Sequence, residues 1–141
     1  MFFHLGELLM KRMVLAFAVM GMVVGSTTPA LAIKEFNDYW TKVHVEGSKD
    51  AAFKELATSA KCNICHVNGE KKTVRNEYGT TISKLVKAKE LKPIAKSDPA
   101  KFEAAMNEAF EKAAAAKAKD GKTFGEKIKA GQLPGGDKDG K

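Results

Sequence analysis

Cysteine and histidine are both scarce in this chain of 141 residues, which contains two cysteines and three histidines. A structural zinc site needs four ligands, usually supplied as two pairs of cysteine or histidine residues. Beyond Cys62, Cys65 and His66, the sequence after residue 32 offers only His44 as a further ligand of this kind. The composition therefore argues against a zinc module.

Two patterns are missing as well. No run of residues alternates as a strand would, and a thioredoxin-like C-x-x-C pair is expected beside a βαβ pattern. The apolar run from Met13 to Val24 falls short of the roughly 20 residues that a membrane-spanning helix needs. We find no internal repeat and no second domain. The sequence thus predicts an all-α fold. It favours neither a redox-active dithiol at the C-x-x-C pair nor an uncleaved membrane anchor at the apolar run.

Both cysteines fall in one motif, Cys62-Asn63-Ile64-Cys65-His66. C-x-x-C-H is the attachment signature of c-type haem. Two thiols about one helical turn apart suit addition to the two vinyl groups of one porphyrin, and the adjacent histidine suits the proximal position on the iron. A chance match in a cytosolic protein is the alternative. We predict one covalent haem c held by Cys62, Cys65 and His66.

The N-terminal segment has the order of a secretory signal. Lys11 and Arg12 form a basic start, an uncharged apolar run follows, and Ala30-Leu31-Ala32 matches an A-x-A cleavage site. We therefore expect residues 1–32 to be a signal peptide, with Met10 as an alternative start, and the mature chain to begin at Ile33. Haem attachment of this kind takes place outside the cytoplasm, so a periplasmic or otherwise exported protein is expected.

The remaining chain is small and basic. Residues 33–141 make one domain of 109 residues, whose core would be marginal unless a haem filled its centre. Removal of Glu7, Lys11 and Arg12 changes the charged residues from 24 basic and 17 acidic to 22 and 16, a formal charge of +6. We expect redox partners with an acidic docking face, or peripheral association with membrane complexes, and no nucleic acid. Lysines that only solubilise a helical surface are the alternative.

Apolar residues recur at helical spacing in about five segments. A first helix carries Phe36, Tyr39, Trp40 and Val43 and ends near Gly47. A second, with Ser48 as its expected N-cap, carries Phe53, Leu56, Ala57, Ala60 and Ile64 and runs into the haem motif. A polar loop covers Val67 to Asn76. A third helix then carries Ile82, Leu85 and Val86, and Pro93 is expected to stop it or to lie just past its end.

The last two segments have clear start signals. Asp98 is the expected cap and Pro99 the first residue of a long helix, which Gly121 ends. The apolar stripe of this helix consists of Phe102, Ala105, Met106, Ala109, Phe110 and Ala113. Thr123 and Glu126 have capping-box spacing for a fifth helix. We expect the domain to span 33–133 and the glycine-rich residues 134–141 to be a mobile tail with nothing to bury.

This arrangement resembles the small class I c-type cytochromes, in which a helix leads into C-x-x-C-H and further helices surround one haem. The motif with Val67, the stretch 75–79 and the segments Thr123-Phe124-Gly125 and Leu133-Pro134-Gly135-Gly136 are similar to those of small secreted bacterial mono-haem cytochromes. The resemblance covers most of residues 33–136. It implies a cytochrome c-like fold, transfer of single electrons, Cys62 and Cys65 as thioether residues and His66 as proximal ligand.

The chain departs from that family at the distal ligand, which is usually a methionine on a loop. Met106 is the only methionine after residue 32, and it falls in the middle of an expected helix. We rank Met106 first as distal ligand, His44 second and a vacant position third. Core packing for Met106 and a surface position for His44 are the alternatives.

Five further positions have weaker arguments. Arg75 could neutralise a haem propionate, and Trp40 and Tyr78 could pack on the porphyrin edge. Lys71 and Lys72 could border an exposed haem edge. Ordinary loop cations and core aromatics are the alternatives.

Two function classes fit the sequence. The favoured class is an electron carrier, not an enzyme, which needs only an exposed haem edge and a complementary surface. The alternative is a haem protein that binds a ligand or reduces a small molecule, such as a peroxidase or gas sensor. That class needs an open or displaceable distal site with acid–base groups nearby, and a short chain poor in histidine disfavours it.

Overall fold

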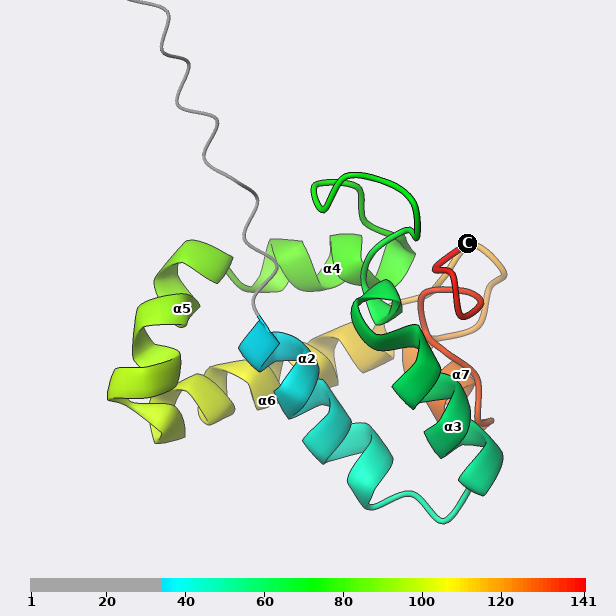
Figure 1. Cartoon of the computed structure of the whole chain (residues 1–141), viewed down its shortest axis with the longest axis horizontal. Helices are drawn as coiled ribbons and strands as arrows, with labels where there is room; N and C mark the ends of the chain where they lie inside the picture. Colours follow the sequence, from blue (N-terminus) through cyan, green and yellow to red (C-terminus); the bar gives the residue numbers. More distant parts are fainter. Residues whose placement is uncertain (1–33) are drawn as a thin grey trace, which may run out of the picture.

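The computed structural model describes residues 34–141, so the predicted signal peptide and its cleavage site lie outside the described residues. The described residues form helices and no β-strand, which confirms the all-α class (Figure 1). None of these helices has both the length and the apolar content to cross a membrane. The elements, in order, are α2 (Lys34–Thr41), η1 (Lys42–Glu46), α3 (Ala51–Ala60), η2 (Lys61–Ile64), α4 (Glu77–Leu85), α5 (Ala88–Ser97), α6 (Pro99–Ala115) and α7 (Phe124–Lys129).

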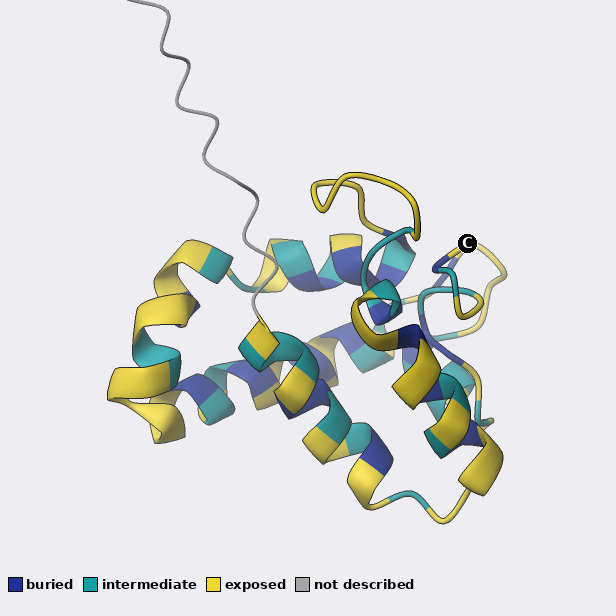
Figure 2. Ribbon diagram, viewed as in Figure 1, coloured by how far each residue is buried: buried dark blue, intermediate teal, exposed yellow. Residues whose placement is uncertain are grey.

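Helix α6 is the centre of the arrangement, since α2, α4, α5 and α7 all contact it. Asp98 caps α6 by accepting from the Lys101 amide, and Pro99 is its first residue, as predicted. Phe102, Met106 and Phe110 of its predicted stripe are buried in the shared core (Figure 2). The helix ends at Ala115 and not at Gly121, because the chain turns back there: the Phe124 amide donates to the Ala116 carbonyl, and the Ala118 amide donates to the Lys122 carbonyl.

The first predicted helix exists and ends at Gly47, but its second half is a π-helical turn, η1. A π-turn spaces its hydrogen bonds five residues apart and so rotates the side chains that follow. Tyr39 and Trp40 are buried as expected, whereas Val43 is 41% exposed and Val45 is buried in its place. The buried face predicted from α-helical spacing is therefore confirmed for the first half of this segment and wrong for the second.

The predicted cap of the next helix was also wrong. Asp50 and not Ser48 caps α3, with the Phe53 amide donating to Asp50 Oδ1 at 3.0 Å. Ser48 instead accepts a hydrogen bond from the Asp50 amide and so supports the cap. Phe53, Ala57 and Ala60 are buried, as the sequence predicted.

Pro93 neither stops a helix nor follows one. Helix α4 ends at Leu85, and a separate helix, α5, contains Pro93 in its interior. The missing amide of a proline removes one hydrogen bond from a helix. Helix α5 tolerates this because Leu91 is buried and Ile94 packs against the core next to α6. Tertiary packing therefore outweighs the local proline rule here.

Residues 134–141 fold back on the C-x-x-C-H motif and the residues just after it. Pro134 is fully buried, the Asn63 side chain donates to the Lys138 carbonyl, and the Asn68 amide donates to the Asp139 carbonyl at 2.8 Å. The prediction that this segment has nothing to bury is wrong, since Pro134 and Gly140 are both buried. Figure 1 shows the red C-terminal segment beside α7.

Candidate functional site

The C-x-x-C-H motif folds as a tight turn at the end of α3. Helix α3 stops at Ala60, and Lys61 adopts φ +49°, a left-handed conformation that is uncommon for a residue with a side chain. The chain then enters the short helix η2, which contains Cys62. The Cys65 and His66 amides both donate to the Cys62 carbonyl, at 3.2 and 3.0 Å. Backbone strain of this kind clusters at functional sites, and here it reorients the chain directly before Cys62.

The three motif side chains line one cavity of about 970 Å³. Cavities that hold small molecules and cofactors generally measure 300–1,000 Å³ and are mostly apolar. Phe36 and Trp40 of α2, Ile82 of α4 and Phe110 of α6 supply apolar walls. Segments distant in the sequence thus build a cofactor-sized space around the motif.

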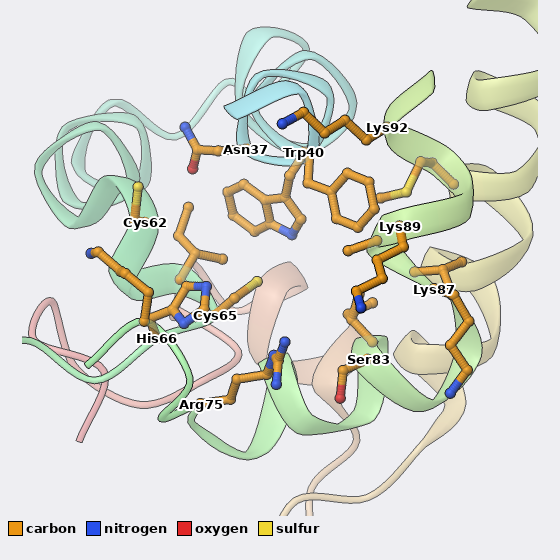
Figure 3. A pocket seen from close by; sticks show the side chains of 18 of the residues that line it. Asn37, Trp40, Cys62, Cys65, His66, Arg75, Ser83, Lys87, Lys89 and Lys92 are labelled. Atoms are coloured by element: carbon orange, nitrogen blue, oxygen red, sulfur yellow. The ribbon is translucent and has the colours of Figure 1, made fainter. Parts of the chain in front are cut away.

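Figure 3 shows how the side chains face this space. Cys62, Cys65 and His66 lie together on one side, and the sulfur of Cys65 points toward the centre. The Trp40 indole faces the centre from above, and the Arg75 guanidinium enters from below. Of the two thiols, that of Cys65 is directed into the space, whereas the Cys62 sulfur lies at its edge.

His66 is held in the tautomer that a metal ligand needs. Its Nδ1 lies 3.2 Å from the Val74 carbonyl oxygen, which can only accept, so Nδ1 donates the proton. Nε2 is then left with a free lone pair. Metal-binding histidines commonly donate their other ring nitrogen to a carbonyl in this way. Burial lowers the pKa of His66. The hydrogen bond to Val74 raises this pKa, whereas the positive charges of Arg75 and Lys72 lower it further. The net effect is a lowered pKa, so the ring is neutral near pH 7.

The two cysteines lie in different surroundings. Neither forms a disulfide, Cys62 is exposed, and burial raises the pKa of Cys65 to about 12. The half-buried Cys65 thiol is therefore protonated near pH 7 and is directed into a largely apolar cavity (Figure 3).

The two candidates for the distal ligand lie in different surroundings. Met106 is fully buried and lines the cavity. His44 does not line it: its ring packs between Trp40 and Phe110, with centroid distances of 5.0 and 5.3 Å. Burial lowers the pKa of His44, and its Nε2 has no hydrogen-bond partner within the described part of the chain. Of the two, only Met106 shares a cavity with the motif.

The weaker candidates divide in the same way. Arg75, Trp40 and Lys72 line the cavity, whereas Tyr78 and Lys71 do not. Tyr78 is buried behind the wall, where its hydroxyl accepts a 3.1 Å hydrogen bond from Trp40 Nε1. Tyr78 therefore supports Trp40 and has no direct access to the cavity.

Exposed basic side chains surround the cavity. Six of them line it against a single carboxylate, Glu90, and these basic residues are Lys61, Lys72, Arg75, Lys87, Lys89 and Lys92. The last three belong to α5 or to the residue before it. Sequence analysis did not predict a role for Lys87, Lys89 and Lys92, because Pro93 argued against the helix that brings them to the cavity.

Sequence reasoning also missed Asn76 and Gly79, which contact the backbone of the motif from α4. An asparagine followed by Glu77 was a usable signal for a helix start, but nothing local indicated its partners.

Within residues 34–141, no group of three or more histidine, cysteine or acidic side chains is arranged to hold a metal ion. Comparisons with protein-family models, with curated proteins and with solved structures found no match for this chain.

Proposed function

We propose that the protein is an exported c-type cytochrome that transfers single electrons between redox partners. Cys62 and Cys65 would hold one haem by thioether bonds, and His66 would bind its iron through Nε2. The observation that carries this proposal is that both thiols and His66 line one cofactor-sized cavity, with the His66 tautomer fixed by Val74. The bound haem would supply the one-electron chemistry by cycling its iron between Fe(II) and Fe(III).

The cavity residues fit a haem in three respects. Aromatic and aliphatic walls from α2, α4 and α6 suit the porphyrin face and exclude water. The Arg75 guanidinium points into the space and is suited to pair with a propionate (Figure 3). The neutral His66 ring needs no deprotonation before it binds iron. The helical domain would then be cytochrome c-like, with the haem completing its core.

Met106 is the distal ligand in this proposal. It is the one methionine after residue 32, it is fully buried, and it lines the same cavity as His66. A thioether ligand on a packed helix moves little between oxidation states, and histidine–methionine ligation raises the reduction potential. Both properties suit a carrier.

The charges around the cavity support a partner with an acidic face. Six exposed basic residues against one carboxylate give the mouth a net positive field, which attracts an acidic protein surface and speeds encounter. Peripheral contact with a membrane complex is compatible with the same field.

Ligand binding or small-molecule reduction is the weaker function. A peroxide-reducing site needs an acid–base group beside the sixth position. Among the side chains that line the cavity, Glu90 is the one carboxylate and His66 the one histidine, and His66 is assigned to the iron. The lining therefore supports a carrier.

Absorption spectra of the purified exported protein, oxidised and reduced, test the proposal. A low-spin c-type spectrum in both states, unchanged by carbon monoxide, is expected. A featureless spectrum would reject the haem, and ready binding of carbon monoxide to the reduced protein would favour the ligand-binding class.

A further inference from the structure

Among residues 34–141, Asn76 is the one buried side chain, 7% exposed, that is neither apolar nor aromatic. It stands at the N-cap of α4, where its Oδ1 accepts from the Gly79 amide at 2.9 Å. Capping accounts for this oxygen alone. Buried polar groups are expensive unless every hydrogen-bonding atom has a partner, so the remaining contacts of Asn76 require an explanation.

Those contacts all lead to the haem motif. Asn76 Nδ2 donates to the Asn63 and Ile64 carbonyls, each at 3.0 Å, and the Asn76 backbone amide donates to the Cys65 carbonyl at 3.1 Å. Three successive carbonyls of the motif therefore bind to one residue. The Cys62 carbonyl accepts from within the motif.

The surroundings of this anchor are tightly packed. A Cβ placed on Gly135 would lie 2.1 Å from Asn76 Nδ2, so the C-terminal segment covers the amide directly. A Cβ placed on Gly79 would lie 1.9 Å from the Cys65 carbonyl oxygen, so α4 also contacts the motif without an intervening side chain. Water is excluded from both positions, which strengthens the hydrogen bonds there.

From these contacts we propose that Asn76 is a positioning residue for the attachment motif. Its amide nitrogen fixes the backbone at residues 63 and 64, and thereby sets the directions in which the Cys62, Cys65 and His66 side chains leave the chain. Because His66 pairs with Arg75 in a short antiparallel bridge, Asn76 also maintains the bond from His66 Nδ1 to the Val74 carbonyl. The effect on the iron rests on the function proposed above, whereas the effect on the backbone does not.

Two substitutions separate anchoring from capping. Asn76→Asp keeps the shape and the capping oxygen but replaces the donor by a second oxygen. Asn76→Ser keeps a capping hydroxyl and adds no charge. Because serine is smaller than asparagine, this substitution introduces no steric clash. Thr123→Ala is the matched control, because it removes the cap of α7, away from the motif.

Hydrogen–deuterium exchange of the exported protein, resolved by peptide, provides the first measurement. In both Asn76 variants, exchange in residues 61–66 should accelerate about tenfold, in keeping with the loss of two hydrogen bonds to buried carbonyls. The first turn of α4 should remain protected, since its cap is retained. In Thr123→Ala, only residues 123–127 should exchange faster.

The reduction potential of the haem-loaded protein provides the second measurement. A hydrogen bond from Nδ1 to a carbonyl makes the ring a better donor to the metal. Weakening this bond in Asn76→Ser should favour reduced iron, so the ratio of reduced to oxidised protein in a fixed redox buffer should rise at least about twofold. Thr123→Ala should leave this ratio unchanged.

Wild-type exchange in residues 61–66 of both Asn76 variants would overturn the proposal, as would accelerated exchange confined to the first turn of α4. An unchanged redox ratio in Asn76→Ser would remove the effect on His66. If the wild-type protein contains no haem, the function proposed above fails, and the exchange measurement still decides whether Asn76 anchors the motif.

Discussion

Replacement of Gly79 by alanine should destabilise the domain by pushing α4 away from the C-x-x-C-H motif. The added Cβ would lie 1.9 Å from the Cys65 carbonyl oxygen, where nonbonded carbon and oxygen atoms need at least about 3 Å. The two backbones must therefore separate by about 1 Å. This oxygen is also held by the Asn76 amide, so neither side can move without loss of another contact.

The magnitude follows from two opposing effects. Alanine is favoured over glycine inside a helix by about 1 kcal/mol. Overpacking of a rigid contact costs about 1–3 kcal/mol, and a backbone–backbone clash falls at the upper end or beyond. The net loss should be about 2 kcal/mol, which for a domain of this size lowers the melting temperature by roughly 10 °C.

Thermal and urea unfolding, followed by far-ultraviolet circular dichroism, measure this loss. Gly47→Ala is the control, because a Cβ there meets nothing within 4 Å and the residue has an ordinary φ of −80°. Its free energy of unfolding should change by less than about 0.5 kcal/mol. Equal stability of the Gly79→Ala and Gly47→Ala proteins would refute the close contact between α4 and Cys65.

Three other predictions concern the ligand, the partner and processing. Ferric protein should show the weak near-infrared charge-transfer band of sulfur–iron ligation. Met106→Ala should abolish this band and lower the potential, whereas His44→Ala should leave the spectrum unchanged; a wild-type protein without the band, together with a change of spin state in His44→Ala, would assign His44. The rate of electron transfer with an acidic partner should fall as the salt concentration rises. Lys89→Gln should slow electron transfer more than Lys49→Gln, because Lys89 lines the cavity and Lys49 does not. A rate independent of salt would mean that these lysines only solubilise the protein. Mass spectrometry of exported protein should find a chain that begins at Ile33, and a protein that retains residues 13–32 would contradict signal cleavage.

Helix positions could be predicted well where local chemistry decides them. Asp98 with Pro99 starts α6, and Thr123 with Glu126 forms the predicted capping box of α7, because these signals involve residues within one turn. Helix ends were less predictable. Residues 116–120 contain good helix formers, so nothing local shows that the chain turns back at Ala116.

The remaining errors have long-range causes. Helix α5 forms around Pro93 because its apolar side packs near α6, and residues 134–141 are held by Asn63 and Asn68, more than 65 positions away. Such contacts leave no trace in local periodicity.

The candidate site shows the same division. Cys62, Cys65 and His66 follow from the motif spacing alone. That Met106 shares their cavity and His44 does not depends on how η1 and α6 pack, which no local pattern encodes. The sequence placed Asn76 only at the end of a polar loop, and its capping and anchoring roles appeared when α4 and the carbonyls of residues 63–65 were placed beside it.

The central claim is that this chain binds one haem covalently through Cys62 and Cys65. Its most direct test is the intact mass, under denaturing conditions, of protein exported from a host that matures c-type cytochromes. We predict a mass of the chain plus one haem, and the mass of the bare chain for the Cys62→Ser/Cys65→Ser double variant. A wild-type mass equal to that of the bare chain, from a host that loads a control cytochrome in the same culture, would contradict the account.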